Sequence, residues 1–127
     1  ALINEYGLNR NIVLTGEIDN VKEWMAISDV FLFASKSEGL PNVLLESMAS
    51  GLPIVTMDIP ATTDFLIDNC KDGYIVKNRE QFIEKVILLI KNEDLRKDIS
   101  VKARTKVATK FSDENICKLY LDLYKTI

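Results

Sequence analysis

The fold is decided by residues 30–57, which read VFLFASKSEGLPNVLLESMASGLPIVTM. The first five of these residues are apolar on every side, as in a strand that is covered on both faces. Pro41 suits the first turn of a helix and Gly51 is the usual residue just past a helix end, so we expect a helix over residues 42–50. Residues 53–57 (PIVTM) predict a second buried strand. A strand, a helix and another strand in this order indicate a parallel sheet covered by helices.

The same alternation extends in both directions from this unit. Residues 11–15 (NIVLT) and 74–77 are predicted to be strands, and the chain opens on a short helix, residues 2–6, closed by Gly7. Further helices are expected at residues 20–28, 61–68, 79–91, 94–110 and 113–126, the last capped by Ser112. The predicted fold class is therefore α/β, a Rossmann-like parallel sheet flanked by helices. Sheets of this kind bind ligands beyond the carboxyl ends of their strands.

The composition narrows the classes of function. A net charge of −3, with no block of lysine or arginine, lacks the footprint of a nucleic-acid binder and argues against contact with an anionic membrane surface. The absence of histidine excludes a Ser-His-Asp triad and removes the commonest ligand of zinc within this chain. Cys70 and Cys117 are expected to be two ordinary thiols, with a disulfide as the open alternative. Since no segment could span a bilayer and no signal-peptide pattern is present, we expect a cytoplasmic chain.

The loop after residues 30–34 carries the candidate chemistry. Two carboxylates, Glu38 and Glu46, stand eight positions apart, one in the loop and one in the helix that follows. Gly39 lets the backbone approach a ligand closely. The first amides of the helix, from Asn42 onward, have no partner within the helix and can donate to an anion. Pro41 has no amide hydrogen and cannot be one of these donors.

A helical wheel places Glu46 away from the packing face of its own helix. The apolar stripe of this helix consists of Leu44, Leu45, Met48, Ala49 and Leu52. Glu46 lies roughly 130° from the centre of that stripe, on the face that it shares with Asn42. Such a glutamate is either a solvated side chain or a carboxylate that accepts hydrogen bonds from a pair of ligand hydroxyls. The wheel leaves both interpretations open.

Residues 37–56, SEGLPNVLLESMASGLPIVT, resemble the signature of the "glycosyl transferases group 1" family, whose motif is Glu, seven residues, Glu. Residues 11–16, 28–35 and 71–76 resemble flanking strands of the family, and residues 94–96 and 111–112 resemble the starts of its closing helices. The resemblance implies the two-domain GT-B fold. It also implies a retaining transferase of the hexosyltransferase type that uses a nucleotide-diphosphate sugar, with no metal and no other cofactor.

The resemblance also implies a role for each motif residue. Glu38 would contact hydroxyls of the donor sugar as the catalytic-site carboxylate, and Glu46 would contact the ribose hydroxyls. Backbone amides at Gly39, Leu40 and Asn42 would approach the sugar and the diphosphate. The acceptor would be a glycan or a lipid-linked acceptor, in polysaccharide or cell-envelope glycan synthesis, with the inner membrane face as a further location for the parent protein.

Several departures from the family pattern shape the expected domain organisation. Residues 1–127 are expected to be a single partial domain, a truncated C-terminal domain of a GT-B enzyme without its first strand–helix units, and inactive alone. Residues 112–127 would form the crossover helix, whose apolar stripe would be exposed and prone to self-association. The strand at residues 12–15 would lack its sheet neighbours and be displaced or pair with another molecule. Residues 59–63 (IPATT) replace a glycine pair, which weakens the case for close backbone approach there.

Two other classes of function compete with the transferase. A receiver-like signalling domain has a similar length and alternation, but it needs an acidic pair after its first strand, where this chain has Thr15, Gly16 and Glu17. A non-catalytic interaction module would keep the fold alone. Trp24 is expected to pack on an amphipathic helix rather than to stack on a sugar.

Overall fold

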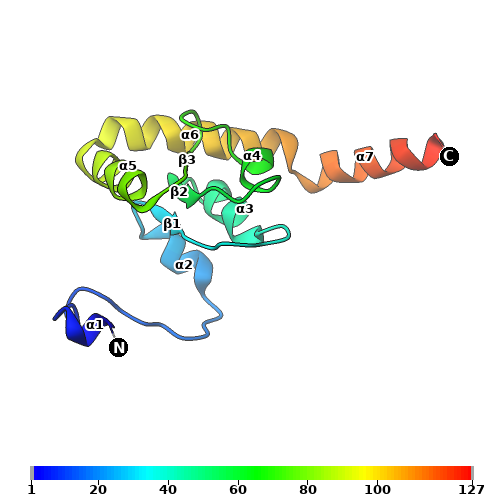
Figure 1. The fold of residues 1–127 in the computed structure, drawn as a ribbon. Helices are drawn as coiled ribbons and strands as arrows, with labels where there is room; N and C mark the ends of the chain where they lie inside the picture. The colour runs from blue at the N-terminus through cyan, green and yellow to red at the C-terminus, as the bar shows by residue number, and fades with distance from the viewer. Residues whose placement is uncertain (1, 127) are drawn as a thin grey trace.

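The computed structural model describes residues 2–126 and confirms an α/β fold (Figure 1). The elements in chain order are α1 (Leu2–Glu5), α2 (Val21–Ala26), β1 (Phe31–Phe33), α3 (Asn42–Ala49), β2 (Ile54–Met57), α4 (Thr63–Leu66), β3 (Tyr74–Val76), α5 (Arg79–Lys91), α6 (Glu93–Lys110) and α7 (Asp113–Lys125). The predicted limits of the domain at Ala1 and Ile127 lie outside the described residues.

The sheet has three parallel strands in the order β1-β2-β3. Phe31 is opposite Ile54 in the first pair of strands, and Val55 is opposite Tyr74 in the second. Helix α3 connects β1 to β2, and the segment that contains α4 connects β2 to β3. The carboxyl ends of all three strands therefore lie at one edge of the sheet, as a Rossmann-like arrangement requires.

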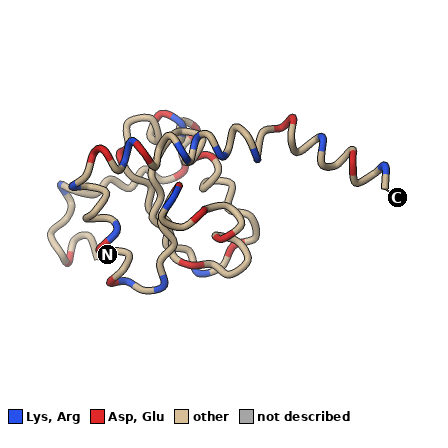
Figure 2. The backbone as a smooth tube through the Cα atoms, turned by 90° about the horizontal axis from the view of Figure 1, so that it is seen from above, with Lys and Arg blue, Asp and Glu red and all other residues tan. Residues whose placement is uncertain are grey.

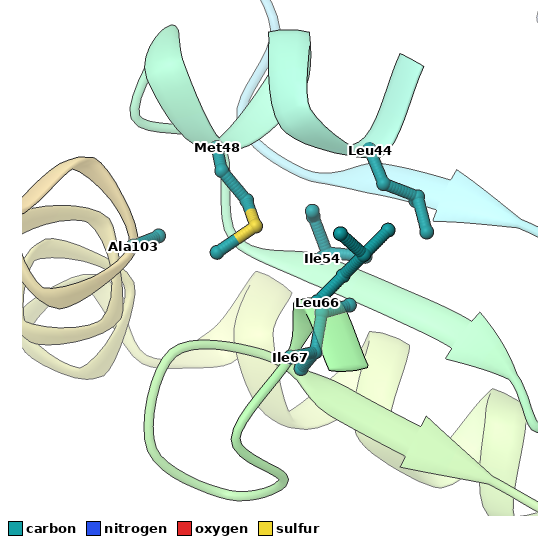
Figure 3. Close-up of a cluster of buried hydrophobic side chains, with 6 residues drawn as sticks. All are labelled: Leu44, Met48, Ile54, Leu66, Ile67 and Ala103. Atoms are coloured by element: carbon teal, nitrogen blue, oxygen red, sulfur yellow. The ribbon is translucent and has the colours of Figure 1, made fainter. Parts of the chain in front are cut away.

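Alternate residues of β2 belong to two separate cores, because successive side chains of a strand point to opposite faces. Ile54 packs in a cluster with side chains from α3, α4, the residue after α4 and α6, and Figure 3 shows these side chains converging on it. The cluster consists of Leu44, Met48, Ile54, Leu66, Ile67 and Ala103. Val55 packs on the other face with Tyr74, Val76, Leu89 and Ile99. Full burial of one such aliphatic side chain is worth about 1.5–3 kcal/mol.

Local capping explains where the long helices begin. The side chains of Asn78, Asn92 and Ser112 accept hydrogen bonds from amides three residues ahead, at 2.9, 3.0 and 3.3 Å. The predicted cap at Ser112 is therefore confirmed. Arg96 of α6 donates to the carbonyl oxygens of Leu89 (2.6 Å) and Ile90 (2.9 Å). These bonds connect the last turn of α5 to the first turn of α6.

A buried ion cluster fastens α6 to the turn before β3. The ammonium of Lys106 lies 3.1 Å from Asp68 Oδ1 and 3.1 Å from Asp72 Oδ2. Lys106 is 7% exposed and Asp72 only 2%, whereas the carboxyl of Asp68 is half exposed. Asp72 Oδ1 also accepts a hydrogen bond from the amide of Asp68 at 2.8 Å. The Lys106 ammonium is the main cause that holds the pKa of Asp68 below its usual value.

The predicted strand at residues 11–15 is wrong. The segment has no strand conformation, and the side chains of Val13 and Leu14 are 73% and 79% exposed. A strand needs a neighbour to complete its hydrogen-bond ladder. Within residues 2–126, the strand β1 pairs only with β2 and no strand pairs with residues 11–15. The composition of this segment favours a strand, but pairing is what creates one.

The predictions for Trp24 and for the last helix have different outcomes. Trp24 is 40% exposed, and the buried residue of α2 is its neighbour Met25, so the predicted packing role of Trp24 is wrong. Helix α7 projects from the rest of the chain, and charges of both signs are distributed along it (Figures 1 and 2). Its apolar stripe is exposed as predicted and consists of Ile116, Leu119, Tyr120, Leu123 and Tyr124. No helix within residues 2–126 is both long and apolar enough to cross a membrane.

Candidate functional site

The candidate site lies at the carboxyl edge of the sheet, where two loops meet. The first loop connects the end of β1 to Asn42, the first residue of α3, and the second connects the end of β2 to α4. The hydroxyl of Thr62 in the second loop donates to the carbonyl oxygen of Gly39 in the first, at 3.4 Å. The structure thus places Gly39 beside a loop that follows it by more than twenty positions in the chain.

Glu38 is held within its own loop by a serine. The hydroxyl of Ser35 lies 2.7 Å from Glu38 Oε1 and 3.3 Å from the carbonyl oxygen of Ser37. The Glu38 side chain is exposed, and no ion pair involves it among residues 2–126. The partner that orients this carboxylate is therefore a neutral hydroxyl. Sequence reasoning missed Ser35 as a partner of Glu38; its place in the same loop is the one local signal that could have indicated it.

Glu46 and Asn42 are exposed on one face of α3, as the helical wheel predicts. The opposite face is buried through Leu44 and Met48, which are inaccessible to solvent. One member of the predicted stripe is wrong, because Ala49 is exposed while Ser47 is buried in its place. The hydroxyl of Ser47 donates to the carbonyl oxygen of Leu44 at 2.9 Å. This bond satisfies its polar group inside the helix, so a serine is tolerated on the packing face.

The start of α3 offers backbone amides to a ligand. The first amide that bonds within this helix is that of Leu44, which donates to the carbonyl oxygen of Pro41 at 2.9 Å. The residue before the helix, Pro41, provides no side-chain cap. The amides of Asn42 and Val43 therefore precede the first bonded one, in the position where helix starts bind anions. Leu40 is exposed beside them.

The far end of α3 packs against α6. Gly51 follows the helix with φ +76°, a conformation that suits glycine. A methyl group on Gly51 would collide with the guanidinium of Arg104 and lie 2.8 Å from the hydroxyl of Ser100. The same guanidinium donates to the carbonyl oxygen of Ser50 at 3.1 Å. The helix that carries Glu46 is thus held at both its end and its buried face.

The loop after β2 adopts a glycine-type conformation without a glycine. Ala61 has φ +62°, a conformation that costs a non-glycine residue roughly 1–2 kcal/mol. Beside it, the hydroxyl of Thr63 lies 3.4 Å from Asp58 Oδ1 and 3.2 Å from the carbonyl oxygen of Ile59. The sequence IPATT therefore has a left-handed backbone at one position although it contains no glycine. Within the described residues, no group of three or more His, Cys, Asp or Glu side chains could hold a metal ion.

The family comparison matches most of the chain. The profile of the family described as "Glycosyl transferases group 1" matches residues 1–106. Poly(ribitol-phosphate) alpha-N-acetylglucosaminyltransferase of Staphylococcus aureus is 29% identical over 128 residues, which cover 98% of this chain and 26% of that protein. N-acetyl-alpha-D-glucosaminyl L-malate synthase of Bacillus anthracis is 30% identical over 125 residues, covering 97% of this chain and 32% of that protein.

Solved structures give the same result. A variant of S. aureus TarM in complex with fondaparinux, alpha-GlcNAc-glycerol and UDP superposes with a TM-score of 0.85 at 28% identity, covering 97% of this chain and 25% of that one. WaaG, a glycosyltransferase involved in lipopolysaccharide biosynthesis, has a TM-score of 0.78 at 25% identity, covering 88% of this chain and 30% of that one. The chain spans about a quarter to a third of the length of these curated relatives. On the profile match, the motif and the GT-B neighbours together, the chain belongs to the glycosyl transferases group 1 family.

Proposed function

We propose that this chain forms the donor-binding part of a retaining glycosyltransferase of the hexosyltransferase type. Its donor is a nucleotide-diphosphate sugar. The parent protein would transfer the sugar to a glycan or a lipid-linked acceptor, in polysaccharide or cell-envelope synthesis. Several relatives have names of this kind, among them the capsular polysaccharide glycosyltransferase CapM of Staphylococcus aureus.

The observation that carries the proposal is the arrangement of two carboxylates around one open helix start. Glu38 lies in the loop before α3, and Glu46 lies one turn after Asn42 on the exposed face of the same helix. Between them stand the amides at the helix start, which suit a diphosphate. A carboxylate at each side suits two sets of sugar hydroxyls, because charge-assisted hydrogen bonds are the stronger kind. Along a nucleotide sugar, the hydroxyls of the donor sugar come first, the diphosphate follows, and the ribose hydroxyls come last.

We assign Glu38 to the hydroxyls of the donor sugar and Glu46 to the ribose hydroxyls. The amides at Gly39, Leu40 and Asn42 are assigned to the sugar and the diphosphate. The hydrogen bond from Ser35 would hold the Glu38 carboxylate in place before the donor arrives. The complex of the TarM variant with UDP is the reason to test uridine nucleotides first.

The binding half of the proposal is tested by titrating the labelled chain with UDP-sugars and following backbone amide shifts by NMR. The largest shifts are expected at Gly39, Leu40 and Asn42. Glu46→Ala should weaken binding roughly 10- to 100-fold, because a hydrogen bond to a charged group is worth about 1.5–3 kcal/mol. Glu84→Ala, at an exposed glutamate of α5, is the matched control and should leave the affinity unchanged. Shifts centred elsewhere, or equal affinity of both variants, would contradict the assignment.

The catalytic half of the proposal is tested in the full-length parent protein. Glu38→Gln keeps the shape of the side chain but removes its charge, so we expect a large loss of kcat with a smaller change in the binding of UDP alone. Product anomers identified by NMR decide whether the configuration is retained. In the isolated chain, donor binding without transfer is expected. Full transfer activity of Glu38→Gln would reject the assigned role of this carboxylate.

A further inference from the structure

Thr62 departs from the usual role of its position in the chain. It is the residue immediately before α4, where a threonine side chain ordinarily accepts a hydrogen bond from an amide of the first helical turn. Thr62 makes no such bond. It is 8% exposed, and its hydroxyl donates instead to the carbonyl oxygen of Gly39 at 3.4 Å. The hydroxyl therefore connects two loops rather than capping its own helix.

The loop that carries Thr62 is fixed by its own hydrogen bonds. The amides of Thr62 and Thr63 both donate to the carbonyl oxygen of Ile59, at 3.0 Å. The amide of Ile59 donates to the hydroxyl of Thr63 at 3.1 Å, and Thr63 is fully buried. The amide of Asp58 continues the ladder of the sheet, with a bond of 2.8 Å to the carbonyl oxygen of Val76. The loop after β2 is thus a closed turn that is anchored to the end of its strand.

The loop that carries Glu38 has no comparable anchor. No backbone hydrogen bond joins residues 35–40 to any other part of residues 2–126. The hydroxyl of Ser35 bonds only within this loop, to Ser37 and Glu38. Within the described part of the chain, the bond from Thr62 is therefore the one hydrogen bond that ties this loop to another segment.

The peptide unit after Gly39 transmits this contact to an amide of the proposed donor site. The carbonyl of Gly39 and the amide of Leu40 belong to one planar trans peptide, so they point in opposite directions. A carbonyl held toward Thr62 therefore holds the Leu40 amide on the side away from Thr62. A hydrogen bond at the carbonyl also polarises the peptide, which makes its amide a stronger donor.

We propose that Thr62 is a positioning residue of the donor site, which aligns the Leu40 amide for the sugar and the diphosphate through the carbonyl of Gly39. This inference rests on the proposed function, because it concerns the same site. Thr62 lies 23 positions after Gly39 and acts on the ligand only through it. The loop after β2 therefore contributes order to the donor site.

The first measurement uses the chain without ligand and follows backbone dynamics by NMR relaxation. Thr62→Val keeps the shape of the side chain but removes the hydroxyl, whereas Thr62→Ser retains the hydroxyl. The order parameter of the Leu40 amide should be about 0.85 in the wild type and in Thr62→Ser, and below about 0.6 in Thr62→Val. An unchanged order parameter in Thr62→Val would overturn the proposal. So would a value below about 0.6 in the wild type, which does not depend on the folding of any variant.

The second measurement compares the binding of UDP-N-acetylglucosamine and of uridine monophosphate (UMP). The first probe contains the sugar for which one relative is named, and UMP keeps the ribose hydroxyls but lacks the sugar and the second phosphate. Thr62→Val should weaken UDP-N-acetylglucosamine about three- to tenfold, the effect of one misaligned neutral hydrogen bond, and UMP by no more than about twofold. Thr62→Ser should bind both probes as the wild type does. Thr105→Val removes an exposed hydroxyl that bonds only within α6, and this matched control should leave both affinities unchanged.

The outcomes distinguish a failure of this inference from a failure of the donor site. If the wild type binds neither probe, or if Glu46→Ala binds both as tightly as the wild type, the donor site itself is rejected. If Glu46→Ala weakens binding while Thr62→Val affects neither probe, only the positioning role is rejected. Equal losses for the two probes in Thr62→Val would show a general structural defect and would reject the positioning role as well.

Discussion

Replacement of Lys106 by methionine is expected to destabilise the chain strongly. Methionine keeps most of the length of the side chain and its apolar contacts but removes the ammonium 3.1 Å from Asp72 Oδ2. Asp72 is 2% exposed and would keep only the amide of Asp68, at 2.8 Å, as a partner. Removing one partner of a buried ion pair costs about 3–5 kcal/mol, since the other charge is left uncompensated. The contact with the half-exposed Asp68 adds at most about 1 kcal/mol.

A second substitution separates the loss of the ion pair from a packing defect. Lys106→Met combined with Asp72→Asn removes the buried charge while an amide oxygen still accepts from the Asp68 amide. It should recover about 2 kcal/mol of the loss, because a neutral group is far less costly to bury. Lys102→Met, on the exposed side of the same helix, is the control and should change the stability by only about 0.5 kcal/mol.

Urea unfolding followed by circular dichroism gives the free energies for this cycle, provided that the transition is two-state. The reasoning is refuted if Lys106→Met costs less than about 1 kcal/mol. It is equally refuted if Asp72→Asn brings no recovery in the Lys106→Met background, since the loss would then arise from packing rather than from an unpaired carboxylate.

Three further predictions concern the left-handed backbone at Gly51 and Ala61 and the pKa of Asp68. Gly51→Ala should destabilise by about 1–2 kcal/mol in urea unfolding, because of the left-handed backbone; the flexible Arg104 side chain that the new methyl group would meet can move aside. Ala61→Gly should stabilise by up to about 1 kcal/mol, as relief of the same strain exceeds the added entropy of the unfolded chain; a loss of stability would contradict this. The pKa of Asp68 is lowered in the folded state, so its contribution is present above the ordinary value of 3.8 and lost as the pH falls below it. Acid titrations should show a smaller loss from Asp68 in Lys106→Met than in the wild type, because only the weaker effects of Lys110 and Lys71 on this carboxyl remain.

Local signals in the sequence predict most of the helices. The cap at Ser112 and the left-handed Gly7 and Gly51 are where the sequence places them, because caps and helix ends depend on neighbours within one turn. Both strands expected within residues 30–57 form, but only β2 is buried; the expectation that the first is covered on both faces is wrong, because β1 has no buried residue and Leu32 is 49% exposed. The loop–helix unit that carries Glu38 and Glu46 follows from the same local signals, and the exposure of Glu46 follows from the helical period.

What the sequence by itself determined is therefore the type of most elements, the family and the candidate donor-binding residues. Only the tertiary structure decided which elements acquire partners. Residues 11–15 have the composition of a strand and no strand beside them, whereas Lys106 looks like a solvated lysine and is buried. Two carboxylates from a turn more than thirty positions earlier compensate its charge. Ladder pairing and charge compensation join residues distant in the chain, so local periodicity contains no information about either.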